Sequence, residues 1–120
     1  MPNSMHHKFH HWMMPVGGLL PLLVLRMLYD KPRHGYQLEE DLSKILGRQI
    51  PEGFIYGLLR RLEMRGLVTY TWEMTTSGPA RKIYKLTDDG REYLILRLKS
   101  ITSIKQIIDY LLKNMNNLDT

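Results

Sequence analysis

The spacing of hydrophobic residues predicts three helices in the first half of the chain. Residues 15–29 are almost wholly apolar, which indicates a helix buried among other elements. Residues 36–46 and 51–66 carry apolar side chains at helical spacing, and a glycine marks the end of each segment. The buried face of the second helix is predicted to comprise Leu38, Leu42, Ile45 and Leu46. The buried stripe of the third helix is predicted to comprise Ile55, Leu58, Leu59 and Leu62.

After residue 66 the period of the pattern changes from helical spacing to strict alternation. Apolar side chains alternate with polar ones over residues 68–75, which predicts a half-buried strand. Residues 81–86 predict a shorter return strand, and the Ser-Gly-Pro-Ala stretch between the two strands predicts a hairpin tip. The apolar side of the first strand is predicted to comprise Val68, Tyr70, Trp72 and Met74.

The last segment predicts a long helix that Thr87 caps, with acidic residues at its positively charged start. Apolar residues recur there in a heptad pattern that Arg97 interrupts, which is typical of a coiled-coil seam with a second copy. The alternative is that the helix packs back on its own domain. The predicted dimerisation residues are Leu94, Ile101, Ile104, Ile108, Leu111 and Met115, and Leu118 continues the same pattern.

Length and composition narrow the functional classes. A chain of 120 residues is expected to form one domain with an added helix. It has no cysteine, which excludes a disulfide scaffold, cysteine-ligated zinc and a thiol nucleophile. It also lacks a phosphate-cradling glycine loop and a convincing Ser-His-Asp set. We therefore expect neither an enzyme nor a cofactor.

The charge distribution favours an anionic partner. The formal net charge is +5, and the stretch from Gly53 to Lys85 carries +4 of it, with six basic and two acidic residues. Nucleic acid and an anionic membrane surface are the partners that a basic protein attracts, and a solvated basic face is the alternative. The first 28 residues look like a signal peptide, but no small-residue cleavage site follows and the apolar run is too short to cross a bilayer. We expect a cytoplasmic protein without a membrane partner.

The order of the predicted elements is that of a winged helix-turn-helix domain. The fold class is therefore mainly α (α+β), with a long C-terminal dimerisation helix. We expect a His/Met-rich N-terminal segment over residues 1–14, the winged helix domain over residues 15–87 and the dimerisation helix over residues 88–120. A helix of this kind fits the major groove of DNA, and the hairpin beside it reaches the backbone or the minor groove.

Three stretches between Pro15 and Leu94 resemble the PadR family of transcriptional regulators, which are dimeric winged-helix repressors. PRHGYQLEEDL is similar to the family's His-Gly-Tyr start of the second helix. GFIYGLLRRLEMRGLV is similar to its recognition helix, and GPARKIYKLTDDGREYL to its wing and the entry to its last helix. Phe54 and Gly57 depart from the family, which usually has a small hydroxyl residue and a proline there. The single helix after the wing is similar to the short-tailed members.

The resemblance implies that the protein represses transcription by binding double-stranded DNA as a homodimer. The residues that it implies for DNA binding are Gly53, Tyr56, Arg60, Arg61, Ser77, Gly78, Pro79, Arg81 and Lys82. Alternatively, Tyr56 packs at the edge of the core, and Arg61 pairs with Glu52 or Glu63. His34 is interpreted as a structural turn residue. A winged-helix module that binds protein instead of DNA is the rival hypothesis, although its third helix would need no basic face.

The resemblance also implies an aromatic or drug-like effector that releases DNA. Aromatic residues and methionines adapt to varied ligands, and they cluster at the N-terminus. The predicted effector residues are Trp12, Met13, Met14 and Tyr93, with Leu94 beside them.

The N-terminal histidines suggest a further alternative, a metal-responsive regulator. His6 with His10 and His7 with His11 are spaced so that a helix would place each pair on one face, which suits a divalent transition metal. An extra helix that uses these residues for ordinary packing, or an artefactual terminus, would explain the same pattern. We therefore predict no metal, with these histidines as weak candidates.

Overall fold

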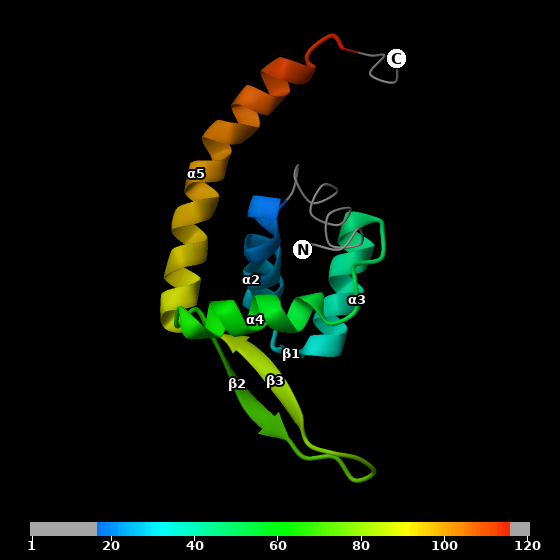
Figure 1. The fold of residues 1–120 in the computed structure, drawn as a ribbon. Coiled ribbons are helices and arrows are strands. Elements are labelled where there is room, and N and C mark those ends of the chain that lie inside the picture. Colours follow the sequence, from blue (N-terminus) through cyan, green and yellow to red (C-terminus); the bar gives the residue numbers. More distant parts are fainter. Residues whose placement is uncertain (1–16, 116–120) are drawn as a thin grey trace, which may run out of the picture.

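A computed structural model describes residues 17–115, and it shows helices packed beside a small antiparallel sheet (Figure 1). In chain order the elements are η1 (Gly17–Leu19), α2 (Leu20–Asp30), β1 (Arg33–His34), α3 (Gly35–Leu46), α4 (Phe54–Met64), β2 (Val68–Glu73), β3 (Arg81–Leu86) and α5 (Asp88–Leu112). The strands are ordered β1-β3-β2. The predicted mainly α (α+β) class and its winged helix-turn-helix arrangement are confirmed.

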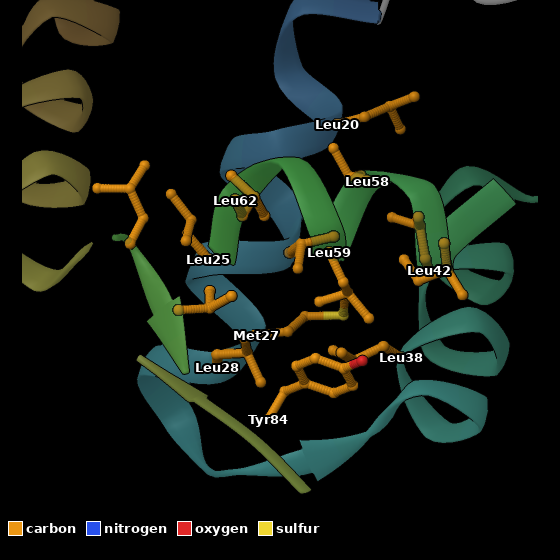
Figure 2. Packing of buried hydrophobic residues seen from close by; sticks show 14 of the residues in the cluster. Leu20, Leu25, Met27, Leu28, Leu38, Leu42, Leu58, Leu59, Leu62 and Tyr84 are labelled. Atoms are coloured by element: carbon orange, nitrogen blue, oxygen red, sulfur yellow. The ribbon is translucent and has the colours of Figure 1, made fainter. Parts of the chain in front are cut away.

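The core lies where α2, α3 and α4 meet the base of the sheet, and leucines dominate it (Figure 2). The predicted stripe of α4 is confirmed, since Ile55, Leu58, Leu59 and Leu62 are all buried. Truncating a buried leucine of this kind to alanine costs about 2–5 kcal/mol. Because burial of these four side chains stabilises the fold, α4 keeps this face in the core and its opposite face remains exposed.

Two expectations about the first helices are corrected. The first helix begins at Leu20 rather than at Pro15, after the 3-10 turn η1, and Pro21 occupies its first turn. Ile45 was expected on the buried face of α3, but it is exposed. The core contacts of α3 come from the buried Leu38 and Leu42 and from the partly buried Leu46, whereas Ile45 lies at the edge of this face and remains in solvent. Gly47 ends α3 at a φ of 72°, as a left-handed helix cap requires.

A strand that the sequence pattern missed completes the sheet. The segment DKPRHG, residues 30–35, is predicted to be a turn from its proline and glycine, but Arg33 and His34 pair antiparallel with β3, opposite Tyr84 and Ile83. Two residues are too few to show alternation, so no periodic signal existed. The pairing ties the turn before α3 to the hairpin.

The hairpin of β2 and β3, called the wing below, projects away from the helices (Figure 1). Its two strands pair antiparallel, with Val68 opposite Leu86 and Trp72 opposite Lys82. The predicted half-buried strand is correct only at its base. Val68 is buried, whereas Trp72 is 59% exposed and Met74 81% exposed. Alternation sets which side of a strand is apolar, but burial needs a neighbouring element, and the outer part of the wing has none among residues 17–115.

Helix α5 starts at the base of the wing and then extends past the rest of the molecule (Figure 1). The predicted cap is confirmed, since the Gly90 backbone N–H donates to Thr87 Oγ1 at 2.9 Å. Two predicted seam residues are corrected. Leu94 is only 1% exposed and belongs to the core of its own domain. Met115 lies beyond the helix, which ends at Leu112.

Residue 118, the next position of the heptad, lies outside the described residues. Among residues 17–115, no helix is both long enough and apolar enough to cross a membrane.

Candidate nucleic-acid interface

The face of α4 that points away from the core carries the predicted recognition residues. Tyr56, Gly57, Arg60 and Arg61 are all exposed there. The helix follows Gly53, whose φ of 85° lies in the left-handed region that a side chain rarely adopts. The structure thus gives Gly53 a conformational role at the start of α4.

Tyr56 is held at the junction between α3 and α4. A Cβ atom at Gly35 would lie 2.4 Å from Tyr56 Cε1, so only glycine leaves room for the ring. About half of the Tyr56 side chain, 49%, nevertheless remains exposed. The ring packs beside Gly35 at the edge of the domain and still faces solvent.

Arg60 and Arg61 retain their charges unpaired within the part of the chain that the structure describes. None of the ion pairs among residues 17–115 includes either guanidinium, so the alternative pairing of Arg61 with Glu52 or Glu63 is absent there. Two free cations on an exposed helix face attract anionic groups.

The two wing cations differ in their surroundings. Arg81 Nη2 lies 2.9 Å from Glu73 Oε1, and Arg81 Nη1 lies 3.4 Å from His34 Nε2. The ammonium of Lys82 instead lies 4.2 Å from the ring centroid of Tyr70 and 5.7 Å from that of Trp72. A carboxylate thus partly neutralises Arg81, whereas aromatic rings hold Lys82 and leave its charge intact.

His34 has the structural role that the sequence suggested. It is the residue before α3, and its backbone N–H donates to Gln37 Oε1 at 3.3 Å. Its ring meanwhile contacts Arg81 on the return strand of the wing. His34 therefore connects the start of α3 to the root of the wing.

A groove of about 710 Å³ runs between α4 and the wing and brings the basic residues together. Arg60 lines it from α4, and Arg81 and Lys82 line it from β3. Its aromatic lining residues are Tyr36, Tyr56, Trp72 and Tyr84. Burial, with smaller effects of Glu63, Tyr56 and Tyr70, raises the pKa of Tyr84, so its hydroxyl stays protonated. Glu63 also lines the groove, but its three cationic side chains outnumber this carboxylate, so the groove is net positive and aromatic, which suits phosphates and sugars.

Sequence reasoning missed Tyr36 and Trp72 as part of this surface. Both are exposed and line the groove, although Trp72 was assigned to the apolar side of a half-buried strand. The available signal was the mostly polar composition of residues 73–79. It indicates that the outer part of the hairpin, which includes Trp72, projects away from the core.

The tip of the wing forms a separate zone. Ser77, Gly78 and Pro79 are exposed there, and Thr75 Oγ1 donates to the Gly78 carbonyl at 2.6 Å to close the loop. None of these residues lines the groove. The structure thus brings Arg60, Arg81 and Lys82 together, but not the tip residues with α4.

The remaining candidates lie elsewhere. Trp12, Met13 and Met14 fall outside the described residues, as do His6, His7, His10 and His11. Within residues 17–115, no group of three or more acidic or histidine side chains could hold a metal ion. Tyr93 is half-buried on α5, between two arginines.

A family model and solved structures identify one family for this chain. A model described as the transcriptional regulator PadR-like family matches residues 24–95. A PadR-like transcriptional regulator from Bacillus cereus superposes with a TM-score of 0.73 at 30% identity, over 82% of this chain and 96% of that one. A PadR family regulator from Eggerthella lenta gives a TM-score of 0.71 at 30% identity, over 92% and 99%. An uncharacterized protein X of Lysinibacillus sphaericus is 28% identical over 83% of this chain and 94% of its own length.

Proposed function

The chain belongs to the PadR-like family of transcriptional regulators, and from this premise we propose that it is an effector-responsive repressor that acts as a homodimer. Its α4 enters the major groove of double-stranded DNA, and its wing contacts the adjacent backbone. The coarser function, a DNA-binding transcriptional regulator, follows from the family and the fold. The residues that bind DNA, the dimer and the effector are the parts proposed here.

One observation carries the choice of surface: the convergence of Arg60, Arg81 and Lys82 on the groove between α4 and the wing. Phosphate contacts supply much of the affinity for DNA, and base contacts from an exposed helix face supply sequence preference. Arg60 lies at the middle of the free face of α4, so it is positioned for base edges. Lys82 lies on the wing, so it is positioned for phosphates.

The outer half of α5 supports the homodimer. Ile104, Ile108 and Leu111 are 50%, 46% and 65% exposed, and they lie at helical spacing on one face. An apolar face of this length is costly to leave in water. A second copy of α5 would cover it, and the two α4 helices would then read half-sites about one helical turn apart.

The test is selection of a random-sequence duplex library by the full chain at two salt concentrations, followed by sequencing. We expect a palindromic motif whose enrichment falls steeply with salt. Salt-sensitive binding without a motif would contradict sequence-specific regulation. No binding at low salt would favour the rival protein-binding module.

Replacing Arg60 with alanine is expected to weaken binding to the selected duplex by about 1–3 kcal/mol, and to relax the preference at one position of each half-site. The reason is that its guanidinium is centred on the exposed face of α4 and has no ion pair in the described part of the chain. The measurement is a titration of the selected duplex and of single-base variants. Binding and preference equal to those of the unmodified protein would show that α4 reads DNA through other residues.

Replacing Lys82 with alanine is expected to weaken binding about equally for all sequences, and to reduce the slope of log K against log salt by about 1. The reason is that a wing cation contacts a phosphate rather than a base. The slope is measured by titration at several salt concentrations. Arg81→Ala is the matched comparison, and we expect it to change the slope less because Glu73 already pairs with Arg81. An unchanged slope for Lys82→Ala would contradict the proposed contact between Lys82 and a phosphate.

A further inference from the structure

Met74 is the most exposed large apolar side chain among residues 17–115, with 81% of its surface in solvent. It directly follows β2, whose outer end projects away from the helices (Figure 1). It belongs neither to the buried core nor to the side chains packed against that core. Single exposed apolar side chains are common on protein surfaces, so the role of this one depends on where it lies.

The strand pattern sets the side of the wing to which Met74 belongs. It follows Trp72 by two positions, and residues two apart share one side of an extended chain. Trp72 lines the groove between α4 and the wing, as does Lys82, which lies opposite it on β3. The ammonium of Lys82 packs against the rings of Tyr70 and Trp72 on this side. Met74 therefore extends the aromatic edge of the groove outward, on the surface proposed to meet DNA.

The tip of the wing carries no charged side chain. Residues 74–80, Met-Thr-Thr-Ser-Gly-Pro-Ala, contain neither an acid nor a base, and the cations of β3 begin only at Arg81. Thr75 Oγ1 donates to the carbonyls of Gly78 and Pro79, at 2.6 Å and 3.3 Å, which closes the loop. A surface that follows phosphates is rich in cations, so this tip suits sugars and base edges instead. The minor groove is only about 6 Å wide, and small uncharged residues fit it.

We propose that the wing tip enters the minor groove beside each half-site, and that Met74 inserts between two base pairs there and bends the DNA. This rests on the proposed function, because the wing must first approach DNA. Apolar side chains, methionine among them, act as wedges of this kind, and partial unstacking of a base step kinks the duplex by about 20–90°. Methionine is unbranched and polarizable, which suits the space between two flat bases.

Insertion gives the protein a sequence preference that needs no hydrogen bond to a base. Pyrimidine–purine steps such as TA and CA unstack and kink more easily than other steps. A duplex with such a step at the insertion point is therefore bound more tightly than one without it. Met74 thus selects a deformable step beside the half-site, while Arg60 reads base edges within it.

The experiment measures the bend of the selected duplex when the full chain binds it, by energy transfer between dyes at the two ends. Met74→Gln keeps the length of the side chain but makes its end polar, and Met74→Leu keeps it apolar. Thr76→Ala is the matched control, because Thr76 is an exposed tip residue that is not apolar. These substitutions change no charge and lie outside the core, so the fold and the salt dependence of binding should be preserved. The library selection is repeated with Met74→Gln.

We expect a bend of about 20–90° with the unmodified protein, Met74→Leu and Thr76→Ala, and loss of most of this bend with Met74→Gln. Met74→Gln should also bind the selected duplex about tenfold more weakly and lose the enrichment of pyrimidine–purine steps beside the half-sites. Three results would overturn the proposal: an unbent duplex with the unmodified protein, an equal bend with Met74→Gln, or a bend that Met74→Leu also loses. Each is measured on a duplex that the protein binds, so it differs from failure of the proposed function, which a selection without a motif would reveal.

Discussion

Replacing Gly90 with alanine is expected to lower the free energy of unfolding by about 3 kcal/mol. The added Cβ would lie 2.0 Å from the carbonyl oxygen of Leu67 and 2.9 Å from its carbonyl carbon. Both atoms belong to the backbone, so no side-chain rotation relieves the clash. Helix α5 or the start of the wing would have to move.

Hydrogen bonds at the same junction oppose that movement. The Thr87 backbone N–H donates to the Leu67 carbonyl at 3.1 Å, and Thr87 Oγ1 donates to the Gly66 carbonyl at 2.6 Å. The Gly90 backbone N–H donates in turn to Thr87 Oγ1. Separating α5 from Leu67 would break this network, so we expect strain rather than easy accommodation.

The measurement is urea denaturation followed by circular dichroism. Gly57→Ala is the matched control, because a Cβ there meets only Arg61 Nη1 at 3.8 Å, an ordinary contact. Alanine in a helix interior is better than glycine by about 0.5–1 kcal/mol, so this control should be slightly more stable than the unmodified protein. Equal stability of the two variants would show that α5 is not held tightly against Leu67.

Replacing Ile104 and Ile108 together with aspartate is expected to convert the proposed dimer to a monomer and to reduce affinity for the selected duplex by about a hundredfold or more. Both side chains are exposed on the apolar face of α5, so their loss spares the core of each domain. Carboxylates there would be buried unpaired against the second copy. A monomer would then bind one half-site without the gain from the other.

Sedimentation equilibrium measures the mass, and duplex titration measures the affinity. The matched control is Thr102→Asp with Gln106→Asp, which has the same spacing on a different face of α5, where both residues are exposed. It should remain dimeric and bind normally. Two results would contradict α5 as the dimer interface. One is a monomeric unmodified protein, and the other is a dimer that persists after both isoleucines are replaced.

Several features of the fold were predictable because neighbouring residues produce them. The apolar spacing of α4 identified Ile55, Leu58, Leu59 and Leu62, and all are buried. The Thr87 cap was predicted from its hydroxyl and the acidic residues that follow it, and the bond to Gly90 is present. The free face of α4 followed directly from its buried stripe.

Other features depend on contacts between distant segments, and the same patterns misassigned them. Leu94 fits the heptad as well as Ile101 does, yet it packs into the core because α5 crosses the domain at that point. Trp72 alternates correctly with its neighbours, yet it is exposed because the wing has left the helices. Periodicity gives the apolar face of an element but not what covers that face.

The sequence alone therefore established the order of helices and strands, their apolar faces and the family motifs, since these arise from residues close together along the chain. The fold alone decided how the charged groups are shared. It pairs Arg81 with Glu73 and His34, and it places the ammonium of Lys82 against Tyr70 and Trp72. Within residues 17–115 it gives Arg60 no ion pair. It also places Arg65 and Arg97 on the same tyrosine ring. Electrostatic interactions fall with distance in space, and spacing along the chain does not give that distance.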